Sequence, residues 1–307
     1  MFIINPNEFL LPSFGMTPFR TKYISENFIL NDDDFAIQYC NDRFGQNQWS
    51  FTYNGREAIA TVLKQYNLDK EDIVTILTTS ENFYISSCVT LEIESVCKWN
   101  REIIPETKMI FVNHEFGYPY PNMEYLTTLG IPIIEDCCTT FFSQDKNNKI
   151  GTYGDFAVYS LPKFFPIQIG GIITSSKNNL SLCKSKCTTE EIKYITKVLS
   201  KNLKETETIL HKRNENFQYA VKCFTSLGFS QRFDLHPATV PYALLLKNNG
   251  IVKNLIDFKK YLYANGIQNS IFYGEDGFFI PNHQNLTQIE INYIFQVVKF
   301  YLKNSNE

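Results

Sequence analysis

The stretch YSLPKFFPIQIGGIITS, residues 159–175, decides the fold and raises the question of function. It holds a single charged residue, Lys163, among aromatic and aliphatic residues. Lysine is almost never fully buried unless something compensates for its charge. A lone lysine in a loop is usually solvated, but in this apolar setting Lys163 is also a candidate for a reactive amine held inside the protein.

On the N-terminal side of this stretch, short apolar segments alternate with helical patterns. Apolar, partly β-branched runs predict strands at 72–79, 108–114, 132–137, 154–161 and 170–175. Apolar residues at helical spacing predict helices at 54–68, 83–95 and 122–130. Strands that alternate with helices and are apolar throughout predict a parallel or mixed sheet covered on both faces.

The pattern differs at the two ends of the chain. The first 50 residues are aromatic and rich in Asn and Asp, and we expect an irregular arm there. A polar stretch after residue 175 leads into a helical region at 188–224 and then a smaller α+β unit. That unit has expected strands at 239–246 and 267–273, a helix at 254–266, and a last helix from 288 that follows a Thr287–Glu290 capping box. The expected division is an arm at 1–50, a large α/β domain at 51–180, and a linking helix with a small domain at 181–307.

The composition of the 307 residues limits the function classes. The net charge is −3, so no basic excess indicates nucleic acid and no basic run indicates a membrane surface. No apolar run is long enough to span a membrane and no signal peptide is recognisable, so the cytoplasm is the expected location. The eight cysteines show no CxxC and no paired zinc spacing, which predicts reduced thiols and no metal site.

Three features fall after predicted strands or at a helix start, where open α/β sheets bind ligands. Asn54-Gly55-Arg56-Glu57 opens a helix, Asp136 ends a strand, and Ser160 and Lys163 end another. Taken singly, the first is commonly a turn and cap, and an acidic residue at a strand end is commonly a helix cap. No GxGxxG follows a strand and no GxxxxGK exists, which disfavours a nicotinamide site and a P-loop.

Together these features match the requirements of pyridoxal 5'-phosphate (PLP). A lysine forms a Schiff base with the aldehyde of this cofactor. A carboxylate keeps the pyridine nitrogen protonated, so that the ring accepts electrons. A helix N-terminus and a hydroxyl hold the phosphate.

The same segments resemble the DegT/DnrJ/EryC1/StrS sugar aminotransferases, a family of fold type I PLP enzymes. IPIIEDCCTT (131–140) is similar to the family's strand ending in Glu-Asp, and GTYGDFAVYSLPKFFPIQIGG (151–171) to its Gly-Asp, Ser, Lys and Gly-Gly segment. Segments 112–126 and 278–302 give looser support. The resemblance runs from about residue 50 to the end, and it implies a mixed, mostly parallel sheet of the seven-stranded type.

The resemblance implies a role for each of the candidate residues. Lys163 would be the Schiff-base lysine and proton shuttle, and Asp136 would pair with the pyridine nitrogen. Ser160 and the backbone around Gly55 and Arg56 would bind the phosphate.

Two further positions follow from the resemblance. An aromatic ring from the helix after the second strand would stack on the cofactor; Tyr84 is the first candidate and Phe83 the alternate. Thr139 takes the place where the family usually has Gln or His near the cofactor's 3'-oxygen, with a hydroxyl that donates over a shorter reach.

The sequence also departs from the family. The Gly-Thr phosphate turn appears as Gly55-Arg56. The chain is short between 175 and 200, where the family carries a loop that shapes the nucleotide-sugar pocket and an Asn that reaches the partner subunit's phosphate. No such Asn is identifiable here.

The resulting expectation is a PLP-dependent aminotransferase. It would move an amino group from an amino acid donor such as glutamate to a keto group, on a nucleotide-linked sugar. Lys163 argues against the family's dehydratase branch, in which histidine replaces the lysine. The alternatives are a non-catalytic or regulatory homologue on the same fold, which the altered phosphate turn favours, and an unrelated α/β enzyme.

A homodimer is the expected assembly, because fold type I aminotransferases place two active sites at a dimer interface. Aromatic residues are enriched at interfaces, and the N-terminal arm would lie near the partner's cofactor site. The rings in question are Phe2, Phe9, Phe14, Phe44, Trp49, Phe51 and Tyr53. The other interpretation is that they pack on their own subunit.

Overall fold

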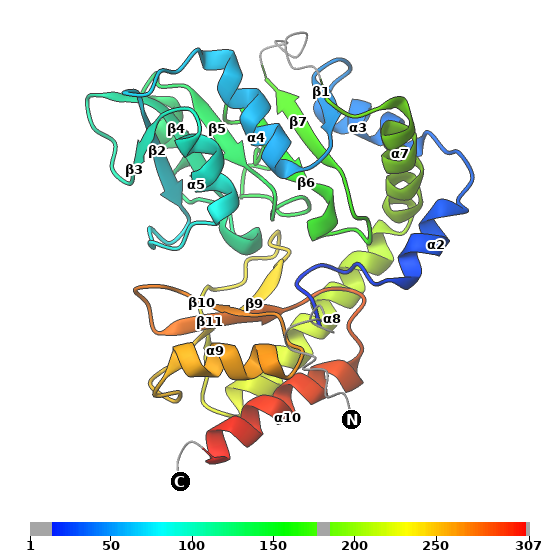
Figure 1. The fold of residues 1–307 in the computed structure, drawn as a ribbon, viewed down its shortest axis with the longest axis vertical. Helices are drawn as coiled ribbons and strands as arrows, with labels where there is room; N and C mark the ends of the chain where they lie inside the picture. The colour runs from blue at the N-terminus through cyan, green and yellow to red at the C-terminus, as the bar shows by residue number, and fades with distance from the viewer. Residues whose placement is uncertain (1–13, 177–184, 305–307) are drawn as a thin grey trace, which may run out of the picture.

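The computed structural model describes residues 14–176 and 185–304. They form a large α/β part and a smaller α+β part, joined by the long helix α8 (Thr206–Thr225) (Figure 1). Phe2, Phe9 and Cys183 lie outside the described residues. Among the helices of the described ranges, none combines the length and apolarity needed to cross a membrane.

The large part is built on a seven-stranded sheet with the strand order β1-β7-β6-β5-β4-β2-β3. Neighbouring strands from β3 through β6 are parallel, whereas β7 is antiparallel to both β6 and β1. The mostly parallel sheet predicted from the sequence is therefore confirmed. The strands are β1 (Trp49–Thr52), β2 (Ile73–Thr78), β3 (Lys98–Asn100), β4 (Thr107–Asn113), β5 (Ile133–Asp136), β6 (Phe156–Ser160) and β7 (Gly171–Ser175).

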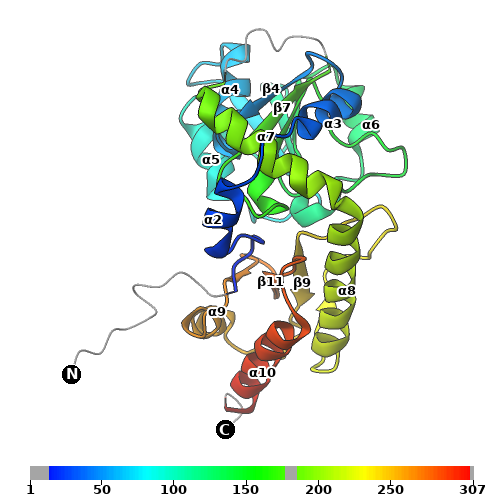
Figure 2. The same cartoon turned by 90° about the vertical axis from the view of Figure 1, so that its right-hand side faces the viewer.

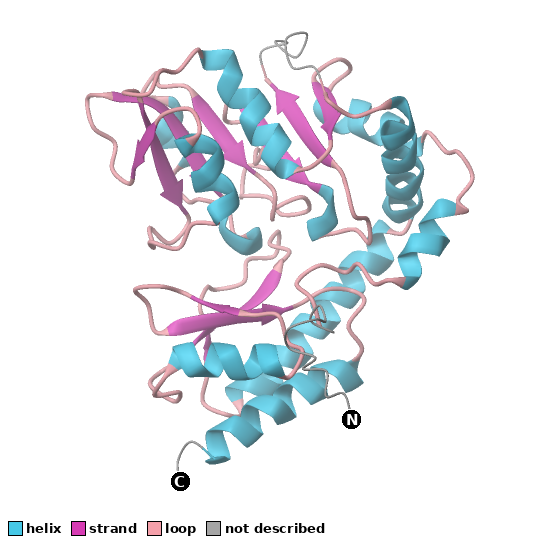
Figure 3. Ribbon diagram, in the orientation of Figure 1, coloured by secondary structure: helices cyan, strands magenta, loops and turns pink. Residues whose placement is uncertain are grey.

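Helices cover both faces of this sheet, as Figures 1 and 3 show. The side chains of β4 alternate: Met109 and Phe111 pack with α4 (Gly55–Leu63) and α5 (Ser87–Glu94). Ile110 and Val112 pack on the other face with α3 (Phe35–Phe44), α6 (Met123–Thr127) and α7 (Thr189–Lys204). A parallel strand buried on both faces reads as a continuous apolar run, which is why β4 was recognisable in the sequence.

The small part is an antiparallel four-stranded sheet, in the order β10-β11-β9-β8, with helices on one side. Its elements are β8 (Ser230–Gln231), β9 (Ala243–Lys247), α9 (Leu255–Ala264), β10 (Ser270–Ile271), β11 (Gly277–Pro281) and α10 (Gln288–Asn304). The predicted capping box is present, because the Thr287 hydroxyl accepts from the Glu290 N–H and the Glu290 carboxylate accepts from the Thr287 N–H. In Figure 2, α8 lies beside this sheet and continues up to the large part.

The expectation of an irregular arm is wrong for the described residues before 50. They form α2 (Lys22–Phe28) and α3, and β1 begins at Trp49. Helix α3 buries Ala36 and Cys40, one turn apart, and the Ala36 N–H donates to the Ser200 hydroxyl of α7. Because this packing partner lies far along the sequence, local composition did not reveal the helix. The domain division at residues 50 and 180 stays a prediction.

Other element boundaries also differ from the expected ones. The helical region at 188–224 is two helices, since Glu205 leaves helical geometry between α7 and α8. Helix α5 begins at Ser87 rather than at 83, because the Ser86 side chain caps it. The short strands β3, β8 and β11 were not predicted, and the strands expected at 239–246 and 267–273 are shorter.

Most of the described arm rings pack on their own subunit. Phe51 is buried in the large core and Trp49 meets it edge to face. Phe44 packs on Tyr159, and Phe14 on Tyr293 of the small part. These contacts favour the alternative that the rings pack on their own subunit, and the expected interface stays a prediction; Tyr53 remains 42% exposed.

Candidate active site

A cavity of about 520 Å³ lies where the carboxyl ends of β4, β5 and β6 face the small part. This is the edge at which open α/β sheets bind ligands. The residues predicted from the sequence that line it are Gly55, Arg56, Tyr84, Asp136, Thr139, Ser160 and Lys163. Phe83 does not line it. The fold therefore brings all but one of the candidates to a single cavity.

Asp136 ends β5 and its carboxylate is held from two sides. Asn113, its register neighbour on β4, donates from Nδ2 to Asp136 Oδ2 over 2.8 Å, and the Cys138 N–H donates to Oδ1 over 3.0 Å. The carboxylate is thus fixed in orientation at the cavity wall, with its residue only 5% exposed.

Lys163 follows β6 on a single 3-10 turn, η3 (Leu161–Lys163). Its Nζ lies 5.0 Å from the centroid of the Tyr242 ring, an arrangement in which the ring face attracts the ammonium. Tyr242 is the main cause that raises the pKa of Lys163, while burial acts in the opposite direction; Cys138, Cys88 and Asp136 add to the rise. In the cofactor-free protein the amine is therefore a cation held against an aromatic ring.

The N-terminus of α4 forms the other end of the cavity. Asn54 caps the helix by accepting from the Glu57 N–H, and the N–H groups of the first turn have no acceptor within a helix. A Cβ built on Gly55 would lie 3.1 Å from Cys138 Sγ and 3.3 Å from Ser160 Cβ. Glycine thus lets this turn approach Ser160 closely.

Ser160 and Arg56 add polar groups to this end. Among the described residues, no group hydrogen-bonds to the Ser160 hydroxyl. The Arg56 side chain is exposed beside the cavity, without an ion-pair partner in the described part of the chain. A helix N-terminus, a free hydroxyl and a cation suit a phosphate group.

Of the two aromatic candidates, only Tyr84 lies at the cavity. Tyr84 lines the cavity and packs edge to face on Phe272 and Phe279 of the small part. Phe83 is 78% exposed and is absent from the cavity lining. Both precede α5 rather than lie on it, because Asn82 accepts from the Tyr84 N–H and holds the chain in a turn.

Thr139 lines the cavity, but its hydroxyl donates over 2.8 Å to the carbonyl of His114. The proton expected to serve the cofactor's 3'-oxygen is therefore directed into the protein. In this arrangement the Thr139 oxygen offers the cavity an acceptor rather than a donor.

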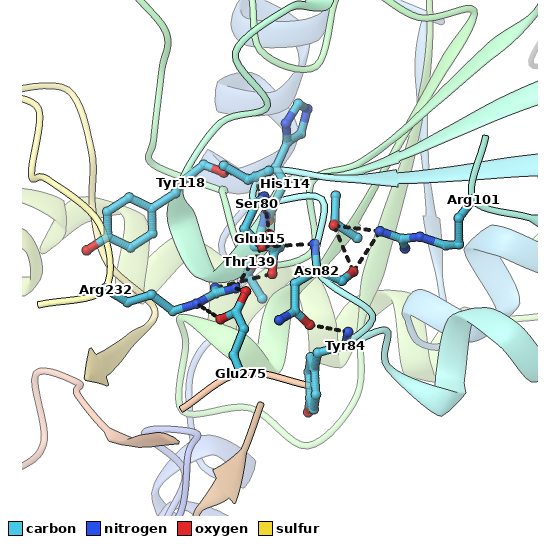
Figure 4. A network of polar contacts seen from close by, with 12 residues as sticks. Ser80, Asn82, Tyr84, Arg101, His114, Glu115, Tyr118, Thr139, Arg232 and Glu275 are labelled. Carbon is cyan, nitrogen blue, oxygen red and sulfur yellow. Dashed lines mark hydrogen bonds and ion pairs between the residues drawn. The ribbon is translucent and has the colours of Figure 1, made fainter. Parts of the chain in front are cut away.

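A buried ionic network lies next to Thr139 and connects the two parts of the molecule (Figure 4). Glu115 lines the cavity and accepts from the Ser80 N–H and hydroxyl, both over 2.6 Å. Arg232 of the small part pairs with Glu115 and, bidentately, with Glu275. Burial raises the pKa of Glu275, but hydrogen bonds from Arg232 and Asn82 outweigh it, so that pKa lies below its usual value.

A second buried cluster has metal-ligand chemistry: His114, Glu135 and Cys137. Its atoms are already engaged, since His114 Nδ1 accepts from the Tyr120 N–H and Nε2 faces Glu135 at 3.2 Å. Glu135 also accepts from the N–H groups of Gly151 and Gly154. These hydrogen bonds hold the loop before β6 in place, and this structural role explains the cluster.

Sequence reasoning missed Asn113 and Tyr242. Asn113 ends β4 and is paired in register with Asp136 at the end of β5. Its position at a strand end could have indicated it, but only once β4 and β5 were known to be neighbours. Tyr242 comes from the small part, 79 positions after Lys163, and no local pattern links the two. The donor set of the cavity fits PLP: an amine, a fixed carboxylate, an aromatic ring, and a helix N-terminus with a hydroxyl.

The architecture defines the class. A mostly parallel seven-stranded sheet with a lysine after β6 and a small α+β part is the fold of type I PLP-dependent aminotransferases. Residues 52–183 match the model of the DegT/DnrJ/EryC1/StrS aminotransferase family. This segment, which carries Asp136 and Lys163, is similar to that family, and the resemblance predicted from the sequence is confirmed.

Solved structures extend the similarity of fold to nearly the whole chain. The aminotransferase TlmJ from Streptoalloteichus hindustanus is 14% identical, with 93% of this chain and 95% of that chain covered and a TM-score of 0.74. PseC from Helicobacter pylori is 15% identical, with 95% and 99% covered and a TM-score of 0.71. The PLP form of Spr1654 from Streptococcus pneumoniae is 13% identical, with 96% and 98% covered and a TM-score of 0.70. No curated protein matches the sequence significantly.

Proposed function

We propose that this protein is a PLP-dependent aminotransferase that acts on a keto group of a nucleotide-linked sugar. The observation that carries the proposal is the presence of Lys163, Asp136, Gly55 and Ser160 in one cavity. These residues come from the ends of two strands, β5 and β6, and from the start of helix α4, so their meeting depends on the fold as a whole.

Each residue of the cavity has a chemical task. When bound, PLP supplies an aldehyde that captures amines and a ring that takes up electrons from the bond being broken. Lys163 Nζ holds the cofactor and carries a proton to and from the reacting carbon. Asp136, oriented by Asn113 and Cys138, keeps the ring nitrogen protonated.

The opposite end of the cavity holds the phosphate. The first N–H groups of α4 and the Ser160 hydroxyl donate to it, and the guanidinium of Arg56 adds a charge where the family has a threonine. Tyr84 supplies the aromatic face over the cofactor. Thr139, whose hydroxyl donates to His114, contributes at most an acceptor near the 3'-oxygen.

The sugar substrate is supported by the small-part wall of the cavity and by the similar proteins. Gln268, Asn269 and Ser270 line this wall with neutral polar groups, which suit hydroxyl-rich ligands. PseC is described as an aminotransferase involved in the biosynthesis of pseudoaminic acid, and Spr1654 as a putative sugar aminotransferase. Glutamate is the proposed amino donor.

We also propose a homodimer in the cytoplasm. The support for a dimer is an apolar patch on and next to α2, where Ile24, Phe28 and Ile29 are 55%, 77% and 77% exposed. Large apolar side chains gathered in this way mark interaction surfaces. The support for a reducing compartment is that the described cysteines are free thiols.

Retention of a complete amine and carboxylate pair favours the enzyme over a non-catalytic homologue on the same fold. A binding protein has no need for a carboxylate that two N–H donors fix in the cavity beside a partly buried amine.

A spectroscopic titration tests the proposal. Protein mixed with PLP should turn yellow, and added glutamate should bleach the colour as 2-oxoglutarate is released. A screen of keto-sugar nucleotides with labelled glutamate then identifies the acceptor. Protein that stays colourless with excess PLP would contradict the proposal. If glutamate bleaches the colour but no keto-sugar nucleotide in the screen accepts the amino group, only the proposed sugar substrate would be contradicted.

A further inference from the structure

Arg213, near the middle of α8, is a fully buried cation that has no anionic partner in the described part of the chain. It is 1% exposed, and no carboxylate of the described residues lies within ion-pair distance of it. Its Nε has no hydrogen-bond partner within the described ranges. Burial lowers the pKa of Arg213 to about 9, so the guanidinium is still charged at neutral pH.

Such a burial is costly, because an unpaired charge in the protein interior loses its hydration without a counter-charge. The cost implies that the guanidinium performs a task that an apolar side chain of similar volume does not. Its contacts indicate what that task is.

One set of contacts reaches the residue after Lys163. The guanidinium carbon of Arg213 lies 4.6 Å from the centroid of the Phe164 ring. Its Nη1 donates over 2.8 Å to Gln284 Oε1, and Gln284 Nε2 donates over 2.7 Å to the carbonyl of Phe164. Arg213 thus holds both the side chain and, through Gln284, the backbone of Phe164.

The other set reaches the ring beneath the amine. Arg213 Nη2 donates over 3.3 Å to the carbonyls of both Pro241 and Tyr242, at the entry to β9. The Tyr242 ring is the one that faces Lys163 Nζ at 5.0 Å. A single guanidinium therefore contacts both Phe164, the residue after Lys163, and Tyr242, whose ring faces the Lys163 amine.

We propose that Arg213 is a positioning residue for Lys163, which fixes the amine over the Tyr242 ring by holding Phe164 and Tyr242 at a set separation. The inference rests on the proposed function only in taking Lys163 as the reactive amine. The planar, forked guanidinium serves three acceptors and one ring face at once, which a lysine ammonium does not reproduce.

The test uses cofactor-free protein and the reactivity of Lys163 itself. Wild type and Arg213→Met are treated with acetic anhydride over a range of pH, and labelling of Lys163 is measured by mass spectrometry relative to exposed Lys146. Loss of the Tyr242 contact returns the pKa of Lys163 toward its ordinary value, and each unit of decrease raises the labelling rate about tenfold. We expect Arg213→Met to label Lys163 at least about fivefold faster near neutral pH.

Three variants make the result specific. Arg213→Lys keeps the charge but loses the fork, and it should give an intermediate increase. Gln284→Leu removes the support of the Phe164 carbonyl and the acceptor of Arg213 Nη1, but it leaves the Arg213 contacts with the Phe164 ring, Pro241 and Tyr242 in place. It should give a smaller increase, and it tests the proposal if Arg213→Met does not fold. Asn248→Ala is the control, because Asn248 is 1% exposed in the small part and, within the described ranges, its side chain bonds only to Val252 and Asp276.

An unchanged or slower labelling of Lys163 in Arg213→Met and Gln284→Leu would overturn the proposal. The same increase in Asn248→Ala would also overturn it, since the effect would then report general loosening. The labelling is measured on cofactor-free protein, so its result does not depend on whether the protein binds PLP. In the loaded enzyme, the positioning role predicts a lower kcat with an unchanged KM.

Discussion

The two ends of the cavity are built in opposite ways. At the Asp136 end, the chain satisfies its own polar groups: Asn113 and the Cys138 N–H hold the carboxylate, and the Thr139 hydroxyl is directed at His114. At the Gly55 end, the N–H groups of Gly55 and Arg56 and the Ser160 hydroxyl have no acceptor among the described residues.

From this difference we infer which end of the cavity needs a bound ligand to complete its hydrogen bonds. The Asp136 end is preorganised, so a bound ring meets a carboxylate that needs no rearrangement. The Gly55 end gains its hydrogen bonds only when an anion arrives. Mutations at the first end should therefore alter chemistry, and mutations at the second should alter cofactor affinity.

The largest expected effect comes from Lys163, between the two ends. Lys163→Ala removes the proposed Schiff-base amine and should lower turnover by roughly 10³-fold or more. The fold should persist, and PLP should still bind through its phosphate. Amino transfer from glutamate is the measurement, with Lys146→Ala, an exposed lysine, as the control. Substantial turnover in Lys163→Ala would mean that another lysine is the catalyst.

Asp136→Asn tests the preorganised end. The change keeps the shape and removes the charge that stabilises a protonated ring nitrogen. We expect kcat to decrease by roughly 10²-fold, as when one preorganised electrostatic contact is lost, together with weaker PLP binding. Steady-state kinetics and a PLP titration measure the two effects. Near-normal kinetics would mean that Asp136 has only a structural role at the end of β5.

Asn113→Leu affects the same end indirectly. It removes a donor to Asp136 Oδ2 but leaves the carboxylate and its Cys138 bond in place. A hydrogen bond to a charged group contributes about 1.5–3 kcal/mol, so we expect a decrease in kcat of about tenfold and a lower Tm. If kcat stayed at the wild-type value while Tm decreased, Asn113 would serve stability alone.

Ser160→Ala gives the smallest effect and the clearest contrast. Because the hydroxyl has no partner among the described groups, its removal should leave Tm unchanged in the absence of PLP. The lost bond to phosphate should weaken PLP binding about three- to tenfold, the scale of one hydrogen bond. Calorimetric titration with PLP measures this. A decrease in Tm as large as that of Asn113→Leu would contradict the difference between the two ends.

Sequence patterns predicted the central sheet well because its strands are buried on both faces. β2, β4, β5, β6 and β7 appear as apolar runs at their observed places. Elements defined by distant partners were missed: α3 depends on α7, and the two-residue strand β8 depends on pairing with β9. Periodicity carries no signal for such contacts.

The same distinction applies to the site. Residues at strand ends were predictable, because parallel strands end at one edge of the sheet. Thr139 shows what sequence cannot supply, namely the direction of a hydroxyl proton. Tyr242 and Arg213 come from elements beyond the large sheet, and only the folded chain brings them to Lys163.

Reduction of the PLP complex with borohydride tests the central claim most directly. Borohydride converts a bond between the cofactor's aldehyde and an amine into a stable link, which peptide mapping then locates. We predict a single pyridoxyl-modified peptide, with the cofactor on Lys163, and none in Lys163→Ala. Modification at a different lysine, or no modification of wild type under saturating PLP, would contradict the assignment of this cavity as a PLP site.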